Sequence, residues 1–283
     1  MRAGLPAATV ADLYRAACLA ELDALKPGNV HAYASGHRMV TADFVTSADV
    51  SAPLLAAPGA RVGARVRGGV EATIAAVGQN TNLGILLLCA PLARAAEAGG
   101  TLAEGLSTVL SEFDASDAAD VFAAIRRANP GGLGKAARHD VTETASVPSL
   151  SEAMAEAAPR DRIARAYTDG FRDLFAIGLP ALAMARGRGL VAPWTTTAVH
   201  LAYLTTVPDS HIARKHGAER AEAVRAEAAT RLAGLDLAEQ PVAALLDYDS
   251  ALKADGLNPG TSADFTVATL FLDALLAARD ERI

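Results

Sequence analysis

The chain has 283 residues, 51% of them hydrophobic and 20% charged, and a formal net charge of −6. Acidic and basic residues are mixed along it, which excludes a nucleic-acid-binding face and an anchor for anionic membranes, since both need concentrated positive charge. No Pro-, Gly- or Ser-rich linker interrupts the chain, so we predict one domain over residues 1–283. The N-terminus lacks the regions of a signal peptide, and the longest apolar run, Leu83 to Ala93, is shorter than the roughly 20 residues that span a bilayer. We expect a soluble, cytoplasmic protein.

Apolar residues recur at helical spacing through most of the chain. In residues 9–25, Leu13, Ala17 and Ala20 fall on one helical face. Aromatic residues make up only 5% of the chain and β-branched runs are short, which favours an all-α, multi-helix bundle over an α/β fold. The expected helices cover residues 9–25, 41–57, 62–77, 83–98 with a kink at Pro91, 101–111, 116–128, 149–157, 160–178, 180–187, 194–207, 209–216, 217–233, 239–254 and 261–280.

The first helix ends at a break that reads Lys-Pro-Gly-Asn-Val-His over residues 26–31. Proline cannot continue a helix, and it disfavours the helical conformation of the residue before it. Gly28 has no Cβ, so its backbone can adopt positive φ or let a ligand approach closely. The break is either a plain helix stop or a place where polar side chains meet a ligand, and the candidates are Lys26, Asn29, His31 and His37.

A second break, residues 79–84, reads Gln-Asn-Thr-Asn-Leu-Gly before an apolar segment. Either Thr81 or Asn82 could act as the N-cap of the following helix, which would be a purely structural role. A cap needs only one such residue, whereas Asn80, Thr81 and Asn82 stand in a row. We therefore predict that they hydrogen-bond a sugar or a phosphate, with the positive end of the helix dipole behind them.

The third break, residues 208–217, combines Asp209 as an expected N-cap with Gly217 as an expected helix stop. Ser210 with Arg214, and His211 with Lys215, are four residues apart and share a helical face. A solvated basic helix end is the structural alternative. Lysine is scarce in this chain, however, and a lysine retained here suggests a point charge for a phosphate. The four lysines are Lys26, Lys135, Lys215 and Lys253.

The fourth break, residues 258–265, reads Asn-Pro-Gly-Thr-Ser-Ala-Asp-Phe. Thr261 and Asp264 fit a variant of the capping box, with Asp in place of Glu or Gln. This leaves Asn258, Gly260 and Ser262 unexplained, and Gly260 before a helix could expose backbone N–H groups to an anion.

All four breaks place polar groups between apolar helices. A buried polar group without a partner costs about 1–3 kcal/mol, so these groups need either one another or a ligand. We predict that the four breaks converge on a central polar cleft.

In their order and spacing the four breaks resemble the landmarks of the triphosphoribosyl-dephospho-coenzyme A synthase family, over roughly residues 10 to 280. This resemblance implies an all-α fold. It also implies a reaction in which ATP gives its triphosphoribosyl group to a ribose hydroxyl of dephospho-coenzyme A and adenine is released. The substrates would be these two small molecules, with Mg²⁺ accompanying ATP.

The chain departs from the family pattern in two places. Asn82 and Leu83 stand where members that serve citrate lyase or malonate decarboxylase have histidine and lysine, and the segment Arg138–Val141 replaces a Gly-x-Arg-Gly-Glu element. The segments 128–134, 140–141 and 161–167 are more similar to a branch found in methanogens and methylotrophs. This similarity suggests an acceptor linked to one-carbon cofactors such as tetrahydromethanopterin or methanofuran.

The chemistry of such a transfer suggests roles for the candidate residues. Breaking the bond to adenine creates oxocarbenium character at C1′, which needs a nearby carboxylate and an acid for the leaving base. The triphosphate needs cations, namely Mg²⁺ with few protein ligands and lysine or arginine. We hypothesise that Lys26, Arg214 and Lys215 hold phosphate, that Asp209 and Asp264 bind Mg²⁺ or stabilise C1′, and that His31 or His211 moves a proton. Glu71 is a further metal candidate, and the remaining substrate contacts are assigned to Gly28, Asn29, His37, Asn80, Thr81, Asn82, Gly84, Ser210, Asn258, Gly260 and Ser262.

Two other functions remain open at this point. A nucleotide- or pterin-binding protein could retain the pocket without catalysis, and a helical scaffold of a cofactor-assembly complex would carry a large exposed apolar patch instead of a polar cavity. His200 lies in an apolar helix and is expected to be packed, and a homodimer is the default oligomer.

Overall fold

The computed structural model describes residues 3–36, 39–129 and 149–281. In these ranges the chain forms fourteen α-helices and no β-strand, which confirms the all-α prediction. β-type pairing there is confined to two isolated bridges, His31–Ala34 and Gly36–Met39, near the first break.

The helices agree with most of the expected ranges to within a few residues. They are α1 (Ala7–Asp23), α2 (Thr41–Leu55), α3 (Val62–Val77), α4 (Leu83–Ala96), α5 (Leu102–Ser111), α6 (Ala115–Ala128), α7 (Leu150–Ala157), α8 (Arg162–Asp169), α9 (Leu179–Gly187), α10 (Trp194–Thr206), α11 (Ser210–His216), α12 (Ala218–Arg231), α13 (Val242–Ala254) and α14 (Gly260–Ala278). A π-helical turn, η1 (Leu174–Gly178), precedes α9, and a 3₁₀ turn, η2 (Leu237–Glu239), precedes α13.

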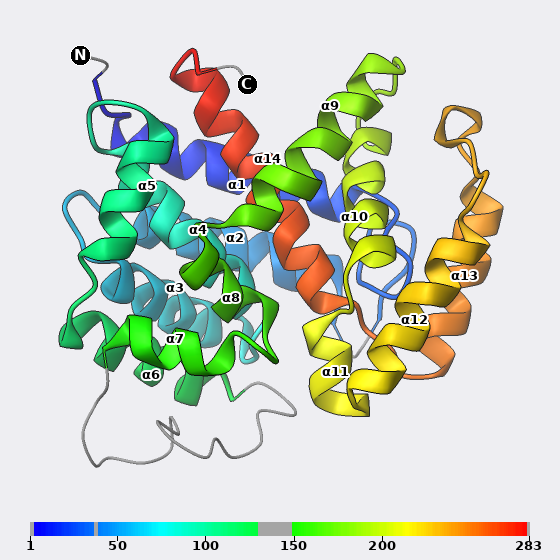
Figure 1. Ribbon diagram of the computed structural model, residues 1–283, viewed down its shortest axis with the longest axis horizontal. Coiled ribbons are helices and arrows are strands. Elements are labelled where there is room, and N and C mark those ends of the chain that lie inside the picture. Colours follow the sequence, from blue (N-terminus) through cyan, green and yellow to red (C-terminus); the bar gives the residue numbers. More distant parts are fainter. Residues whose placement is uncertain (1–2, 37–38, 130–148, 282–283) are drawn as a thin grey trace.

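The last helix, α14, runs through the centre of the molecule and packs against α1, α4 and α10 (Figure 1). It is long and apolar enough to cross a membrane by composition, but 67% of that stretch is buried inside the protein, so its apolar surface serves the core. Together with α4, which continues unbroken through Pro91, it forms the middle of the largest apolar cluster.

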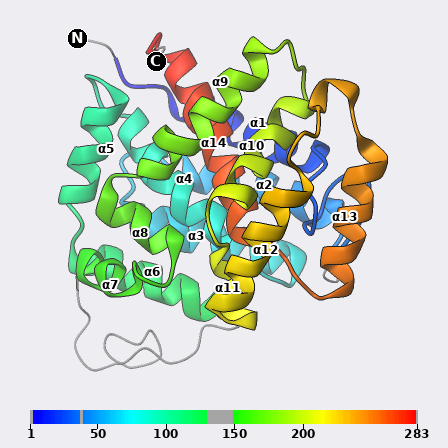
Figure 2. The ribbon, with the colours of Figure 1, turned by 45° about the vertical axis from the view of Figure 1, so that its right-hand side comes forward.

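A second, smaller apolar cluster joins α10 to α12 and α13 and includes Trp194, Leu204 and Tyr248. Figures 1 and 2 both place α12 and α13 on the side of the molecule away from α5. Since α10 also contributes Val199 and Tyr203 to the large cluster, it connects the two.

One predicted helix boundary is wrong. Residues 160–178 were expected to form one helix ending near Gly178, but α8 ends at Asp169, where Gly170 and Phe171 adopt positive φ of 71° and 61°. The helix that follows runs through η1 directly into α9. Gly178 is a packing residue: a Cβ there would lie 2.1 Å from Oγ1 of Thr269. Glycine at this position reflects close helix contact, which a local sequence pattern does not distinguish from a helix stop.

Candidate functional site

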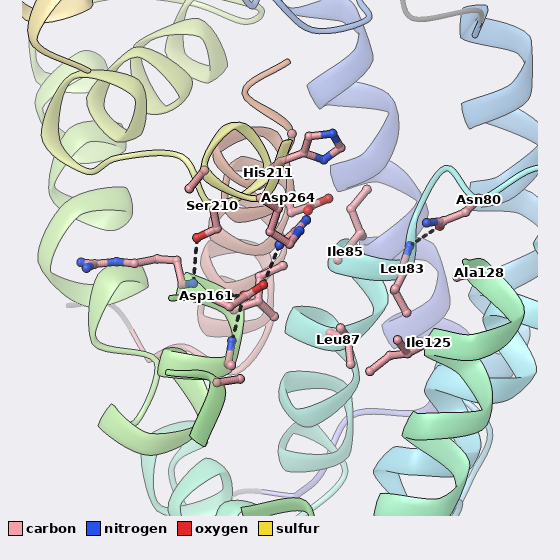
Figure 3. Close-up of a pocket in the computed structure, with 18 of the residues that line it drawn as sticks. Asn80, Leu83, Ile85, Leu87, Ile125, Ala128, Asp161, Ser210, His211 and Asp264 are labelled. Carbon is pink, nitrogen blue, oxygen red and sulfur yellow. Dashed lines mark hydrogen bonds and ion pairs between the residues drawn. The ribbon is translucent and has the colours of Figure 1, made fainter. Parts of the chain in front are cut away.

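Residues from all four breaks line a single cleft of about 1390 Å³. Its walls come from α4, α6, the segment from α7 to α8, α11 and the start of α14, which are far apart in the sequence (Figure 3). The sequence candidates that line it are Asn29, Asn80, Thr81, Gly84, Ser210, His211, Arg214, Lys215, Asn258, Gly260 and Asp264. The predicted convergence is therefore present in the structure.

Asp264 lies at the centre of the cleft, between the side that carries Asp161, Ser210 and His211 and the wall formed by α4 (Figure 3). A Cβ built on Gly84 would lie 2.0 Å from Oδ2 of Asp264, so only glycine leaves room for this carboxyl group against α4. Burial, together with the negative charge of Asp209, raises the pKa of Asp264 well above its ordinary value. At neutral pH this carboxyl group is therefore suited to donate a proton.

The first and fourth breaks are joined directly. The Asn29 side-chain amide donates a hydrogen bond of 2.8 Å to Oδ1 of Asn258. Oδ1 of Asn29 in turn accepts a bond of 2.8 Å from the backbone N–H of Val30. Both asparagines line the cleft, so each helps to hold the other in place while one edge of its amide remains beside the cavity.

Arg214 and Lys215 on α11 reach the cleft near the start of α8. The Arg214 guanidinium forms an ion pair of 2.6 Å with Oδ2 of Asp161. Oδ1 of Asp161 caps α8 by accepting the N–H groups of Ile163 and Ala164. Lys215 is exposed and also lines the cleft.

Arginines that the sequence did not single out add positive charge to the same opening. Arg127 at the end of α6 and Arg160 before α8 are exposed and line the cleft. Arg162 lines it too, but its guanidinium is engaged by both carboxylate oxygens of Asp173, at 2.5 and 2.8 Å. A cue was present in the sequence, since Arg160, Asp161 and Arg162 directly follow Pro159 at a helix start.

The opposite wall of the cleft is apolar. Figure 3 shows Leu83, Ile85 and Leu87 of α4 near Ile125 and Ala128 of α6, on the side of the view away from Asp161 and Ser210. The end of α7 extends this surface with Ala153, Met154 and Ala157. The cavity therefore has a charged side and an apolar side, and its volume exceeds the roughly 300–1,000 Å³ of a typical single-ligand pocket.

Lys26, Gly28 and His31 lie behind the cleft. Lys26 is fully buried, with Nζ 2.8 Å from Oε1 of Glu21 and 2.6 Å from the Val30 carbonyl oxygen. Nε2 of His31 lies 3.3 Å from a carboxylate oxygen of Asp249, and burial lowers the pKa of His31. Gly28 adopts a φ of 83° and donates its N–H to Asp249. The structure thus places the turn's backbone and its charged residues against α13 and α1. Among the candidates of this break that the structure describes, Asn29 is the one at the cavity.

Asp209 also lies outside the cavity, where it holds two helices together. Its carboxylate accepts the N–H groups of His211 and Ile212 at the start of α11, and both the N–H and the hydroxyl of Ser262 in α14. Four donors occupy its oxygens, so Asp209 and Ser262 serve the scaffold in this arrangement.

Of the three polar residues 80–82, two line the cleft and one joins helices in the scaffold. Asn80 accepts the N–H of Leu83 at 3.1 Å and lines the cleft, and the Thr81 hydroxyl lies 2.5 Å from that of Ser47. Asn82 is buried, and its side-chain amide donates to Thr73. Asn82 therefore ties α4 to α3.

The other candidates lie elsewhere. Glu71 is on the surface of α3, paired with Arg67 at 2.8 Å, and His200 is fully buried as expected. His37 and the segment Arg138–Val141 lie outside the described residues.

Within the described ranges, no group of three or more potential metal ligands occurs. Of the carboxylates that line the cleft in these ranges, Glu21, Asp161 and Glu222 are each paired with a cation, and Asp264 lies at its centre. Mg²⁺ commonly keeps several waters and binds through one or two carboxylates together with substrate phosphates. The residues fit a Mg²⁺ that arrives with a nucleotide better than a resident metal ion.

Comparisons with known proteins match this chain to a family. A family model described as ATP:dephospho-CoA triphosphoribosyl transferase matches residues 7–282, and so includes all four breaks. Among solved structures, a protein of Archaeoglobus fulgidus named as a triphosphoribosyl-dephospho-CoA synthase has 25% sequence identity to this chain. That similarity has a TM-score of 0.61 and covers 82% of this chain and 97% of the other. No curated protein matches the chain.

Proposed function

The chain belongs to the ATP:dephospho-CoA triphosphoribosyl transferase family, and we propose that the cleft around Asp264 is where it carries out the transfer. The enzyme moves the triphosphoribosyl group of ATP to dephospho-CoA. The bond between C1′ and adenine breaks, a bond forms between C1′ and a hydroxyl oxygen of the acceptor, and adenine leaves with one proton while the hydroxyl loses one.

The observation that carries the assignment is the position of Asp264. A carboxyl group with a raised pKa, in the centre of a cavity that all four breaks line, can donate the proton that adenine needs in order to leave. Loss of this proton leaves a carboxylate near the developing positive charge of C1′, which it would stabilise. Asp264 would thus act first as an acid and then as an electrostatic partner.

The charged side of the cleft suits the triphosphate. Lys215, Arg127 and Arg160 are exposed at the opening, and Arg214 adds a fourth cation whose charge is shared with Asp161. Mg²⁺ bound together with ATP would neutralise part of the triphosphate charge, and the exposed Lys215, Arg127 and Arg160 would hold the rest. The amides of Asn29, Asn80 and Asn258 also border the cavity, where they could orient a ribose.

The apolar wall suits the acceptor. The pantetheine arm of dephospho-CoA is long and largely apolar, and the surface formed by Leu83, Ile85, Leu87 and Ile125 would bury it. Leu83 stands where a lysine occurs in relatives that serve citrate lyase, so this wall is also where acceptor preference could differ within the family.

The test is to incubate the purified protein with ATP, Mg²⁺ and dephospho-CoA and to measure both adenine and the mass of the product by liquid chromatography and mass spectrometry. We expect one adenine for each acceptor converted. Asp264→Asn should reduce the rate about 10²- to 10⁴-fold. The control is Asp247→Asn, because Asp247 pairs with Arg231 on the exposed surface.

Other results would separate the alternatives. Adenine release with a precursor of tetrahydromethanopterin or methanofuran, but not with dephospho-CoA, would keep the chemistry and replace the acceptor. Binding of ATP without adenine release for any acceptor would identify a nucleotide-binding protein and refute the transferase assignment.

A further inference from the structure

We propose that Glu21 is a second reacting carboxylate of the cleft, which accepts the proton of the acceptor hydroxyl, and that Lys26 is the positioning residue that holds it. This inference rests on the proposed function. The proposed pair would explain why the first break carries a lysine, Lys26, although this lysine does not line the cavity.

The geometry of the pair supports this division of roles. Glu21 lies one turn before the break, in the last part of α1, and lines the cleft although its side chain is only 6% exposed. The chain turns back after Asp23, so that Nζ of Lys26 lies 2.8 Å from Oε1 of Glu21. Lys26 has no exposed surface, and its Nζ also donates a hydrogen bond of 2.6 Å to the carbonyl oxygen of Val30. The lysine is thus fixed behind Glu21, on the side away from the cavity.

Glu21 and Asp264 face the same cavity from two helices in contact. α1 and α14 lie side by side in the centre of the molecule, in both views (Figures 1 and 2). The negative charge of Glu21 is one of the causes that raise the pKa of Asp264. Burial also raises the pKa of Glu21, but the adjacent Lys26 opposes this rise. Two carboxyl groups in one site with unlike neighbours are the usual arrangement for a base and an acid.

The proton count of the transfer balances when both groups take part. The acceptor oxygen bonds to C1′ as its proton passes to the ionised Glu21, and the C1′–adenine bond breaks as the protonated Asp264 gives its proton to the leaving base. At the end Glu21 is protonated and Asp264 ionised. Release of one proton by Glu21 to solvent and uptake of one by Asp264 restore the starting state, so the cycle is balanced without another reactant.

A purely structural ion pair is the competing explanation. A buried pair that only stabilises the fold can often be exchanged for neutral groups of similar shape at little cost, whereas removing one partner is strongly destabilising. This difference allows a decisive experiment, because the double variant Glu21→Gln/Lys26→Met removes both charges while nearly preserving the volume of the side chains.

We would measure kcat, the KM for ATP and thermal stability for Glu21→Gln, Lys26→Met, the double variant and Glu21→Asp. We expect the double variant to fold with near wild-type stability and to lose at least 100-fold in kcat, with the KM for ATP changed less than about threefold. Glu21→Asp keeps the charge but shortens the side chain, so it should fold and lose about 10-fold in kcat. Lys26→Met alone should lower kcat without a matching change in KM, as expected for a positioning residue.

The control is the exposed pair Arg220–Asp255, 2.7 Å apart, replaced as Arg220→Met/Asp255→Asn. This variant should retain wild-type kcat. A double variant at Glu21 and Lys26 with kcat within about threefold of the wild type would overturn the inference, and so would a fully active Glu21→Asp. Wild-type protein that releases no adenine would instead refute the proposed function, so the two failures are distinguishable.

Discussion

The substitution Gly84→Ala tests whether the position of Asp264 matters for catalysis. A Cβ at residue 84 would lie 2.0 Å from Oδ2 and 2.5 Å from Cγ of Asp264, so the carboxyl group must rotate away. Alanine in a helix is about 1 kcal/mol more favourable than glycine, and the displaced rotamer costs about 0.5–1.5 kcal/mol. The two effects nearly cancel, so the melting temperature should change by less than about 4 °C.

Activity should respond far more strongly than stability. A displacement of about 1 Å at a reacting group can cost about 100-fold in rate, so we expect adenine release from ATP to fall by about that factor. The matched control is Gly68→Ala in the middle of α3, where a Cβ would make only ordinary contacts of 3.6 Å or more with Leu54. A Gly84→Ala enzyme as active as the Gly68→Ala enzyme would refute the role given to Asp264.

Three further predictions concern pH and charge. The raised pKa of Asp264 means that the protein loses stability as the pH rises above 3.8, the ordinary pKa of an aspartate. Asp264→Asn should therefore stabilise the protein in urea unfolding at pH 8 and have no such effect at pH 3.5. Burial lowers the pKa of His200 to about 3, so below pH 6.5 the imidazole becomes protonated only in the unfolded state. The free energy of unfolding then falls by up to about 1.4 kcal/mol for each pH unit of acidification, and His200→Leu should flatten this slope between pH 6.5 and 5. Lys215→Ala should raise the KM for ATP about 10-fold, which corresponds to the loss of about 1.5 kcal/mol expected for a charged hydrogen bond, and this increase should be smaller at high salt. The control Arg188→Ala, on the exposed surface, should leave the KM for ATP unchanged.

The fold was predictable because its signals are local. Helical spacing, proline and glycine breaks, and capping residues specify where most of these helices begin and end, as Asp209 and the start of α11 illustrate. The exception, Gly178, is set by a contact with Thr269 that lies about ninety residues away. No local pattern contains that contact.

The site was predictable as a set of breaks, but not residue by residue. Four polar segments between apolar helices indicate a common cavity, because their groups need partners. Which group faces the ligand is decided by tertiary packing. Lys26 and Asp209 are charged members of their breaks, yet each is satisfied inside the scaffold. Glu21 and Arg127 line the cavity from within regular helices, where charged residues are ordinarily assigned to solvent.

The helices that carry the reacting groups are also tied together far from the cleft. Arg279, just beyond α14, buries its guanidinium against the carbonyl oxygens of Ala96 and Ala98, both 3.0 Å away, at the end of α4. At the other end of the same two helices, Gly84 receives the carboxyl group of Asp264. With both ends fastened, α4 and α14 should be the slowest part of the molecule to exchange amide hydrogens with deuterated solvent. We expect the movements that admit substrate and release product to occur in the helices α6, α7, α8 and α11, whose amide exchange rates ATP should change first.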